Sequence, residues 1–219
     1  MGLKVYLAIA GLLVVSGTVR ADTVFTERGA FAAAITSDST TLETWDEFAA
    51  GVLLPSWNGI TYTPGFGGDV AQVTDFFLSL SPPNTLGAAA VGFFDTGETM
   101  TFTFSSPINI FAINFNSFAF GSGYQLSTNT GSVALSAYDP FPSAGSGEFV
   151  GLISTFAFTS VTITPLDDPG CGAPCSYTLD DMTYGSTATQ PPTVPEPASL
   201  LMMASGLAVW FVCKRLRQQ

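Results

Sequence analysis

Apolar and polar residues alternate along much of the interior of the chain. Residues 99–104 read TMTFTF, residues 108–115 read INIFAINF and residues 156–165 read FAFTSVTITP. Alternation with a period of two, in segments rich in Phe, Ile, Val and Thr, is typical of strands with one buried face. The pattern therefore predicts three strands.

Polar clusters that contain Gly, Pro, Asn or Asp separate these segments. Their spacing of about 8 to 12 residues favours an antiparallel β-sandwich or jelly roll. The predicted turns lie at residues 105–107, 121–123, 129–131, 139–140 and 143–147.

One short helix is expected near the start of this β-rich part. Residues 27–35 read ERGAFAAAI, in which Phe31, Ala34 and Ile35 share one face and Thr26 is the expected N-cap. Two further strands are predicted at 41–45 and 59–63. The fold class is thus mainly β, an antiparallel sandwich or jelly roll with one short N-terminal helix, plus a C-terminal hydrophobic helix.

The first 21 residues have the pattern of a secretory signal peptide. Lys4 precedes the apolar run 5–15, and Val19-Arg20-Ala21 predicts cleavage after Ala21. The alternative is a membrane anchor, but a helix of this apolar length covers only about 16 Å of a hydrocarbon core about 30 Å thick.

The last part of the chain has the pattern of a membrane helix. A Pro/Thr-rich linker at 186–193 leads to the apolar run 198–213, which three basic residues follow by position 217. A helix of this length reaches about 24 Å, a short span. Its basic flank predicts that the terminus stays on the cytoplasmic side.

The ectodomain, residues 22–185, is strongly acidic. The chain has 17 Asp+Glu, 6 Lys+Arg and no His, with a net charge of −11; residues 22–195 alone contain 16 acidic residues and a single base, Arg28, for a net charge of −15. Nucleic acid is excluded as a partner, because its binding depends on Lys and Arg that neutralise phosphates. The lack of His excludes Ser-His-Asp and Cys-His catalysis.

Two cysteines and three acidic pairs are the candidates for chemistry. Cys171 and Cys175 predict a disulfide in an exported protein, with a metal site or a redox role as alternatives. The pairs Asp46-Glu47, Asp167-Asp168 and Asp180-Asp181 raise the possibility of a glycosidase, which uses two carboxyl groups. Neighbours in a strand face opposite ways, so such an enzyme would combine carboxylates from separate strands.

Aromatic residues near predicted loops are candidates for sugar binding. Flat rings stack on pyranose rings while adjacent amides and carboxylates bind hydroxyl groups. The candidate ligand-binding residues are Trp57, Tyr124 and Tyr138. The alternative is that these side chains fill the core of the sandwich.

The C-terminal segment resembles a known sorting signal. Pro195-Glu196-Pro197, the apolar helix and the basic cluster, within residues 194–219, resemble the PEP-CTERM signal of exported bacterial proteins. The resemblance implies processing by exosortase, transient anchoring in the inner membrane, and a final place at the cell surface or in the extracellular matrix. The alternative is an ordinary C-terminal anchor.

The ectodomain is similar to the lectin-type jelly rolls found ahead of such tails. The matching segments are TVFTERGAFAAAI, ETWDEFAAG followed by GITYT, and YTLDDMTYG. This resemblance implies a structural Ca²⁺ held by Asp46, with Glu43 nearby, and by Asp180 or Asp181. The alternative is that these are solvated acids.

Together with these features, the resemblance to PEP-CTERM proteins implies an exported, exosortase-processed protein of the envelope or the exopolysaccharide matrix of a biofilm. Its expected role is structural or adhesive, with extracellular polysaccharide as the ligand, and not enzymatic. The alternatives are a carbohydrate-active enzyme that uses paired carboxylates and a permanently anchored surface protein without a ligand.

Overall fold

The structure is a computed structural model and describes residues 22–36, 38–76, 81–95, 97–117, 123–136, 148–166 and 176–187. Within these ranges it has one helix, α1 (Arg28–Ala34), and eleven strands. The strands are β1 (Thr23–Phe25), β2 (Ser39–Glu43), β3 (Ser56–Trp57), β4 (Ile60–Pro64), β5 (Ala71–Thr74), β6 (Thr85–Ala88), β7 (Met100–Ser117), β8 (Tyr124–Thr128), β9 (Val133–Leu135), β10 (Glu148–Pro165) and β11 (Tyr177–Ser186).

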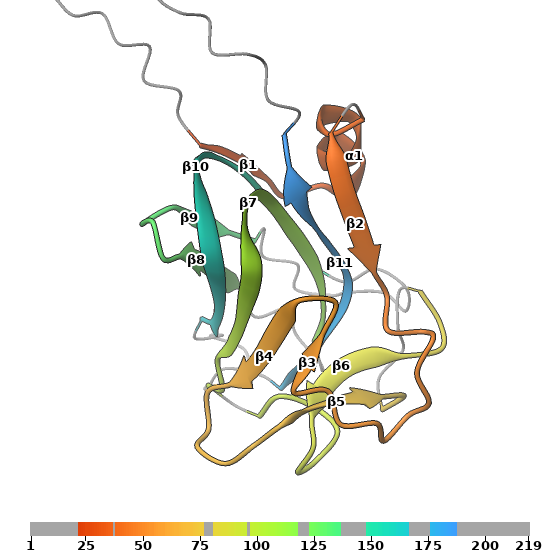
Figure 1. Cartoon of the computed structure of the whole chain (residues 1–219). Coiled ribbons are helices and arrows are strands. Elements are labelled where there is room, and N and C mark those ends of the chain that lie inside the picture. Colours follow the sequence, from red (N-terminus) through yellow and green to blue (C-terminus); the bar gives the residue numbers. More distant parts are fainter. Residues whose placement is uncertain are drawn as a thin grey trace, which may run out of the picture.

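Two long antiparallel strands, β7 and β10, organise the fold. Each has 18 residues and bends midway (Figure 1). The pairing of β10 with β7 shifts register between Ile153 and Phe158 and again between Phe158 and Ser160. The strand bends at these shifts. The two halves of each long strand therefore belong to two different layers of a sandwich.

The remaining strands extend these two layers. The first layer combines the N-terminal half of β7 and the C-terminal half of β10 with β4 and β3 on one side and β8 and β9 on the other. The second combines the other halves with β11, followed by β2 and by β6 and β5, on one side and β1 on the other. Every pairing is antiparallel, so the predicted mainly β antiparallel sandwich with one short N-terminal helix is confirmed.

The core lies between the two layers and is rich in aromatic rings. Phe102 and Phe111, from the two halves of β7, have ring centroids 5.7 Å apart, so one strand packs against itself across the core. On the outer side of the second layer, Phe31 of α1 packs on Ile110 and Phe149. The helix thus covers one end of that side, and in the described part of the chain no helix covers the outer side of the first layer (Figure 1).

Two local predictions are wrong. The N-cap residue of the helix is Glu27 and not Thr26, and the Glu27 side chain makes no capping hydrogen bond. The predicted turn at 105–107 is part of β7, where Ser105, Ser106 and Pro107 are exposed at the bend between the paired segments. The Ser105 N–H donates to the Gly59 carbonyl at 2.8 Å, whereas Ser106 and Pro107 have no paired residue, so the missing N–H of Pro107 disrupts no ladder.

The signal peptide, the Pro/Thr-rich linker from residue 188 onward, and the C-terminal helix lie outside the described residues. Within the ranges described, no helix is both long and apolar enough to cross a membrane.

Candidate functional site

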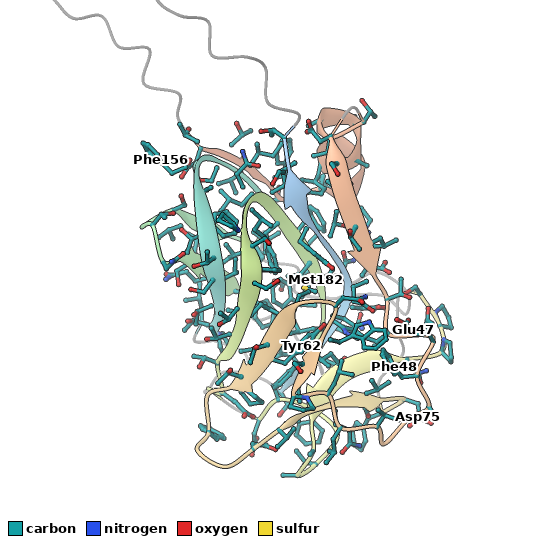
Figure 2. The ribbon with its side chains drawn as sticks, in the orientation of Figure 1. Glu47, Phe48, Tyr62, Asp75, Phe156 and Met182 are labelled. Carbon is teal, nitrogen blue, oxygen red and sulfur yellow. The ribbon has the colours of Figure 1, made fainter. Side chains whose placement is uncertain are left out.

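An aromatic and acidic surface lies where the chain leaves β2 and returns to β3. In the connecting segment, Trp45 is fully buried and adopts a positive φ of 60°. Its indole lies in the core; of the residues that follow, Glu47 is exposed and Phe48 is partly buried against the core. Figure 2 shows Glu47 and Phe48 side by side in this segment, to the right of Tyr62 on β4.

A tight hairpin presents Trp57 beside this segment. Asn58 and Gly59 join β3 to β4 with φ values of 48° and 76°, the two successive positive φ angles that a type I′ turn requires. Trp57 is 39% exposed, and its ring meets Phe48 edge-on with centroids 5.0 Å apart. We call Trp57, Asn58, Phe48, Glu43 and Glu47 the Trp57 surface.

Glu43 is the buried polar group of this surface. Its side chain is 3% exposed, and the amide Nδ2 of Asn58 donates to its Oε2 at 3.3 Å. Burial, followed by the charge of Glu47 and a hydrogen bond between the two carboxyl groups, raises the pKa of Glu43 to about 7. The Glu43 carboxyl group therefore keeps its proton to a higher pH than an ordinary glutamate does.

Two further polar atoms lie buried beneath the carboxyl pair. The Tyr62 hydroxyl and the Trp45 indole nitrogen have no partner at full hydrogen-bond geometry among the described residues. Burial raises the pKa of the Tyr62 hydroxyl. The Trp45 indole N–H lowers this pKa in part, and the charges of Glu43 and Glu47 raise it further. The carboxyl pair thus lies above a polar spot in an otherwise apolar core.

The chemistry of the Trp57 surface suits a polyhydroxylated ligand. It offers the partly exposed side chain of Trp57, the amide of Asn58, and an exposed carboxylate at Glu47. Such a set provides an apolar plane together with acceptors and donors for hydroxyl groups. Sequence reasoning named Trp57 and missed its connection to Glu43 and Glu47; the Asn58-Gly59 dipeptide was the available signal for the hairpin.

Asp46 and Asp180, two of the three expected calcium ligands, hold opposite ends of the segment 81–84. Asp46 Oδ1 accepts the backbone N–H of Asn84 at 3.0 Å. The carboxylate of Asp180, which is fully buried, accepts the N–H and the hydroxyl of Ser81, each at 3.0 Å, and the N–H of Asp181 at 2.8 Å. Burial raises the pKa of Asp180 to about 6.

The third expected ligand, Asp181, pairs with the one basic residue of the ectodomain. Arg28 Nη2 lies 3.3 Å from Asp181 Oδ2 and donates to the Asp181 carbonyl at 3.0 Å, and the same guanidinium binds Asn114. Asp181 has a φ of 49° at a register shift of β11, and its carboxylate has a different partner from that of Asp180.

A calcium ion at these residues would have to displace these contacts. N–H and O–H donors occupy the Asp180 oxygens, a guanidinium neutralises Asp181, and a Ca²⁺ ion needs six to eight free oxygen ligands. Over the part of the chain that the structure describes, no three acidic, Cys or His side chains are grouped for a metal. Calcium at Asp46, Asp180 and Asp181 stays a prediction that the described contacts do not favour.

Tyr124 differs from the expected exposed aromatic. It is fully buried and stacks on Phe115 at a centroid distance of 4.0 Å, so its face is closed to a sugar and the core alternative holds for it. The other site residues lie outside the described residues: Tyr138, Cys171, Cys175, Pro195, Glu196 and Pro197.

Comparison with known proteins supplies the identity of the tail. Residues 193–217 match the model of the PEP-CTERM protein-sorting motif. The chain therefore carries this motif and is an exported protein with a C-terminal sorting tail. No match to the curated proteins is found.

Among solved structures, the chain is similar to carbohydrate-binding modules. A mutant of the family 29 module CBM29-2 complexed with mannohexaose has 10% identity and a TM-score of 0.36, with 68% of this chain and 94% of that chain covered. The GH26-CBM35 β-(1,4)-mannanase of Podospora anserina has 17% identity and a TM-score of 0.37, with 71% of this chain and 29% of that chain covered.

Proposed function

We propose that this protein is processed by exosortase and released to the cell surface or the extracellular matrix, where it binds polysaccharide in a structural or adhesive role. The sorting motif at 193–217 supports the first part of the proposal. Exosortase would remove the apolar segment near Pro195-Glu196-Pro197, after transient anchoring in the inner membrane.

The half-exposed ring of Trp57 is the observation that carries the second part. Trp57 is held edge-on by Phe48 and flanked by Asn58 and the two glutamates. A large aromatic that stays 39% exposed on a folded domain is a common anchor of binding surfaces. An acidic ectodomain repels anionic polymers, which favours a neutral polysaccharide as the ligand.

The alternative of a carbohydrate-active enzyme needs two carboxyl groups on either side of a glycosidic bond. Such groups are about 5 Å or more apart. Glu43 and Glu47 instead share a hydrogen bond, and Glu43 is buried. Asp180 is buried, and Asp181 is paired with Arg28. These arrangements favour binding over hydrolysis.

The mass of the mature protein tests the processing. We expect the protein recovered from the cell surface to begin at Asp22 and to lack the apolar segment 198–213. Substituting Glu196→Ala should leave the tail attached. An intact C-terminal peptide in the surface protein would contradict exosortase processing and favour a permanent anchor.

Affinity electrophoresis in gels that contain a neutral polysaccharide, such as mannan or dextran, tests the binding. We expect Trp57→Ala to abolish the retardation of the protein. The matched control is Phe156→Ala, which removes a side chain that is 68% exposed at the other end of the molecule (Figure 2). Equal retardation of both variants and the parent would overturn the role of Trp57.

A further inference from the structure

The outer side of the first layer carries a regular array of hydroxyl groups. In β4, β7, β8 and β10 the residues that alternate with the core residues are almost all Thr or Ser. We call this set the hydroxyl face. Its members are Ser56, Thr61, Thr63, Thr101, Thr103, Gln125, Ser127, Ser160, Thr162 and Thr164.

The strand register aligns these side chains in rows across the sheet. One row pairs Thr63 with Thr101, Thr101 with Thr162, and Thr162 with Ser127. The next row pairs Ser56 with Thr61, Thr61 with Thr103, and Thr103 with Ser160. Neighbours in a row are about 4.8 Å apart, and the rows are about 6.7 Å apart along a strand.

Several of these hydroxyl groups are free to bind a ligand. Thr101 and Thr162 bond to each other at 2.9 Å, whereas Thr61, Thr63 and Thr103 are exposed and have no side-chain hydrogen bond to the described part of the chain. Each free hydroxyl is both a donor and an acceptor, and the threonine methyl groups add apolar contact area.

The hydroxyl face carries no charge. Among the described strands of the first layer, no Asp, Glu, Lys or Arg lies on this outer side, although residues 22–195 have a net charge of −15. Exposed Val133 and Leu135 of the edge strand β9 continue it as an apolar margin. Edge strands usually carry charged residues that prevent pairing with other chains, so an uncharged face that reaches an edge calls for a different explanation.

We propose that the hydroxyl face is a second binding surface, for an extended, neutral polysaccharide. The match is one of charge and of hydrogen-bonding groups, because such a polymer offers closely spaced hydroxyls and no charge. A neutral ligand also avoids the repulsion that an anionic one would meet on this acidic chain.

This surface is separate from the Trp57 surface. Trp57 pairs with Ile60, which faces the core, so Trp57 projects on the inner side of the first layer at its edge, whereas Ser56 and Thr61 project on the outer side. The two surfaces therefore contact the polymer separately, and retention in the gel depends on both of them. Two binding surfaces on different sides of one domain would let a single molecule link two polymer chains.

The test uses the full-length chain with Thr63→Val and Thr103→Val combined. Valine keeps the shape and the strand preference of threonine and removes only the hydroxyl. We expect unchanged melting and about a tenfold or greater loss of affinity for mannan or dextran in affinity electrophoresis. The matched control combines Thr23→Val and Thr40→Val, exposed threonines of β1 and β2 in the second layer, and should bind as the parent does.

Each outcome decides the proposal. Loss of binding in the Thr63/Thr103 double variant only, with the control unchanged, supports it. The double variant could instead bind as the parent does while Trp57→Ala abolishes binding. This result would overturn the proposal that the hydroxyl face binds polysaccharide and would leave the Trp57 surface as the binding site. Parent-like binding combined with a changed sedimentation coefficient of the free protein would instead assign the face to a second copy of this chain, which also overturns the proposal.

Discussion

Glu43 couples the stability of the domain to pH. Burial and the neighbouring Glu47 raise its pKa from an ordinary carboxyl value to about 7. The folded state therefore binds more protons than the unfolded state between the two pKa values, and the stability is lost as the pH rises through that window. Asp180, with a pKa raised to about 6, acts in the same direction.

We predict that Glu43→Gln stabilises the protein at pH 8, by about 2 kcal/mol, and changes little at pH 4.5. Glutamine keeps the shape and the bond to Asn58 without the buried charge. Thermal melts followed by circular dichroism at both pH values measure the difference. Asp75→Asn is the control, because it removes one charge from an exposed residue; an equal gain in that variant would attribute the effect to net charge alone.

At this scale, the sequence predicts residue types better than their surroundings. Trp57 and Tyr124 were equal candidates, yet the chain exposes the first and buries the second. The alternation within YQLST indicates that Tyr124 is buried, because Tyr124 lies on the same side of β8 as the buried Leu126. No local pattern marks Glu43 as buried, because its burial depends on Trp45 and on the hairpin at Asn58.

At the scale of elements, the close pairing of β2 with β11 depends on a glycine. A Cβ added at Gly185 would lie 2.1 Å from the carbonyl oxygen of Ser39 and 2.8 Å from the Cα of Thr40. Both atoms are backbone, so β2 would have to move away. Since β2 leads directly to Glu43, a shift of this strand would also disturb the Trp57 surface.

We predict that Gly185→Ala lowers the free energy of unfolding by about 2 kcal/mol or more. Gly29→Ala is the matched control: its added Cβ meets no atom within 4 Å, and alanine in a helix gains about 0.5 to 1 kcal/mol over glycine. Urea denaturation compares the two variants. Equal stability of both would show that β2 is not held where the structure places it.

The strands themselves were largely predictable, and their bends were not. Alternation locates the paired parts of β7 and β10, because one side of each strand must be buried. It does not show that Ser105, Ser106 and Pro107 continue a strand, because turn residues also occur at a bend that has no ladder partner. The two-layer arrangement depends on that bend and on long-range pairing.

At the scale of the whole molecule, calcium is a direct test of the acidic clusters. Asp180 and Asp181 are already engaged by Ser81 and Arg28, so we predict that these two residues contribute no calcium-specific rise in the melting temperature of the protein. The measurement is calorimetric melting with millimolar calcium, with magnesium as the control for ionic strength, and with a chelator. A rise of several degrees with calcium alone would show a site that binds the native state.

The fluorescence of Trp57 reports whether this residue contacts a bound polysaccharide. The chain has three Trp: Trp45 is fully buried, Trp210 lies in the apolar tail segment, and Trp57 is partly exposed. We predict that titration with a neutral polysaccharide shifts the emission to the blue. Trp57→Phe should bind without the shift, because phenylalanine keeps a stacking ring, and Trp57→Ala should not bind. An unchanged shift in Trp57→Phe, or an absent shift with every neutral polymer, would contradict the account.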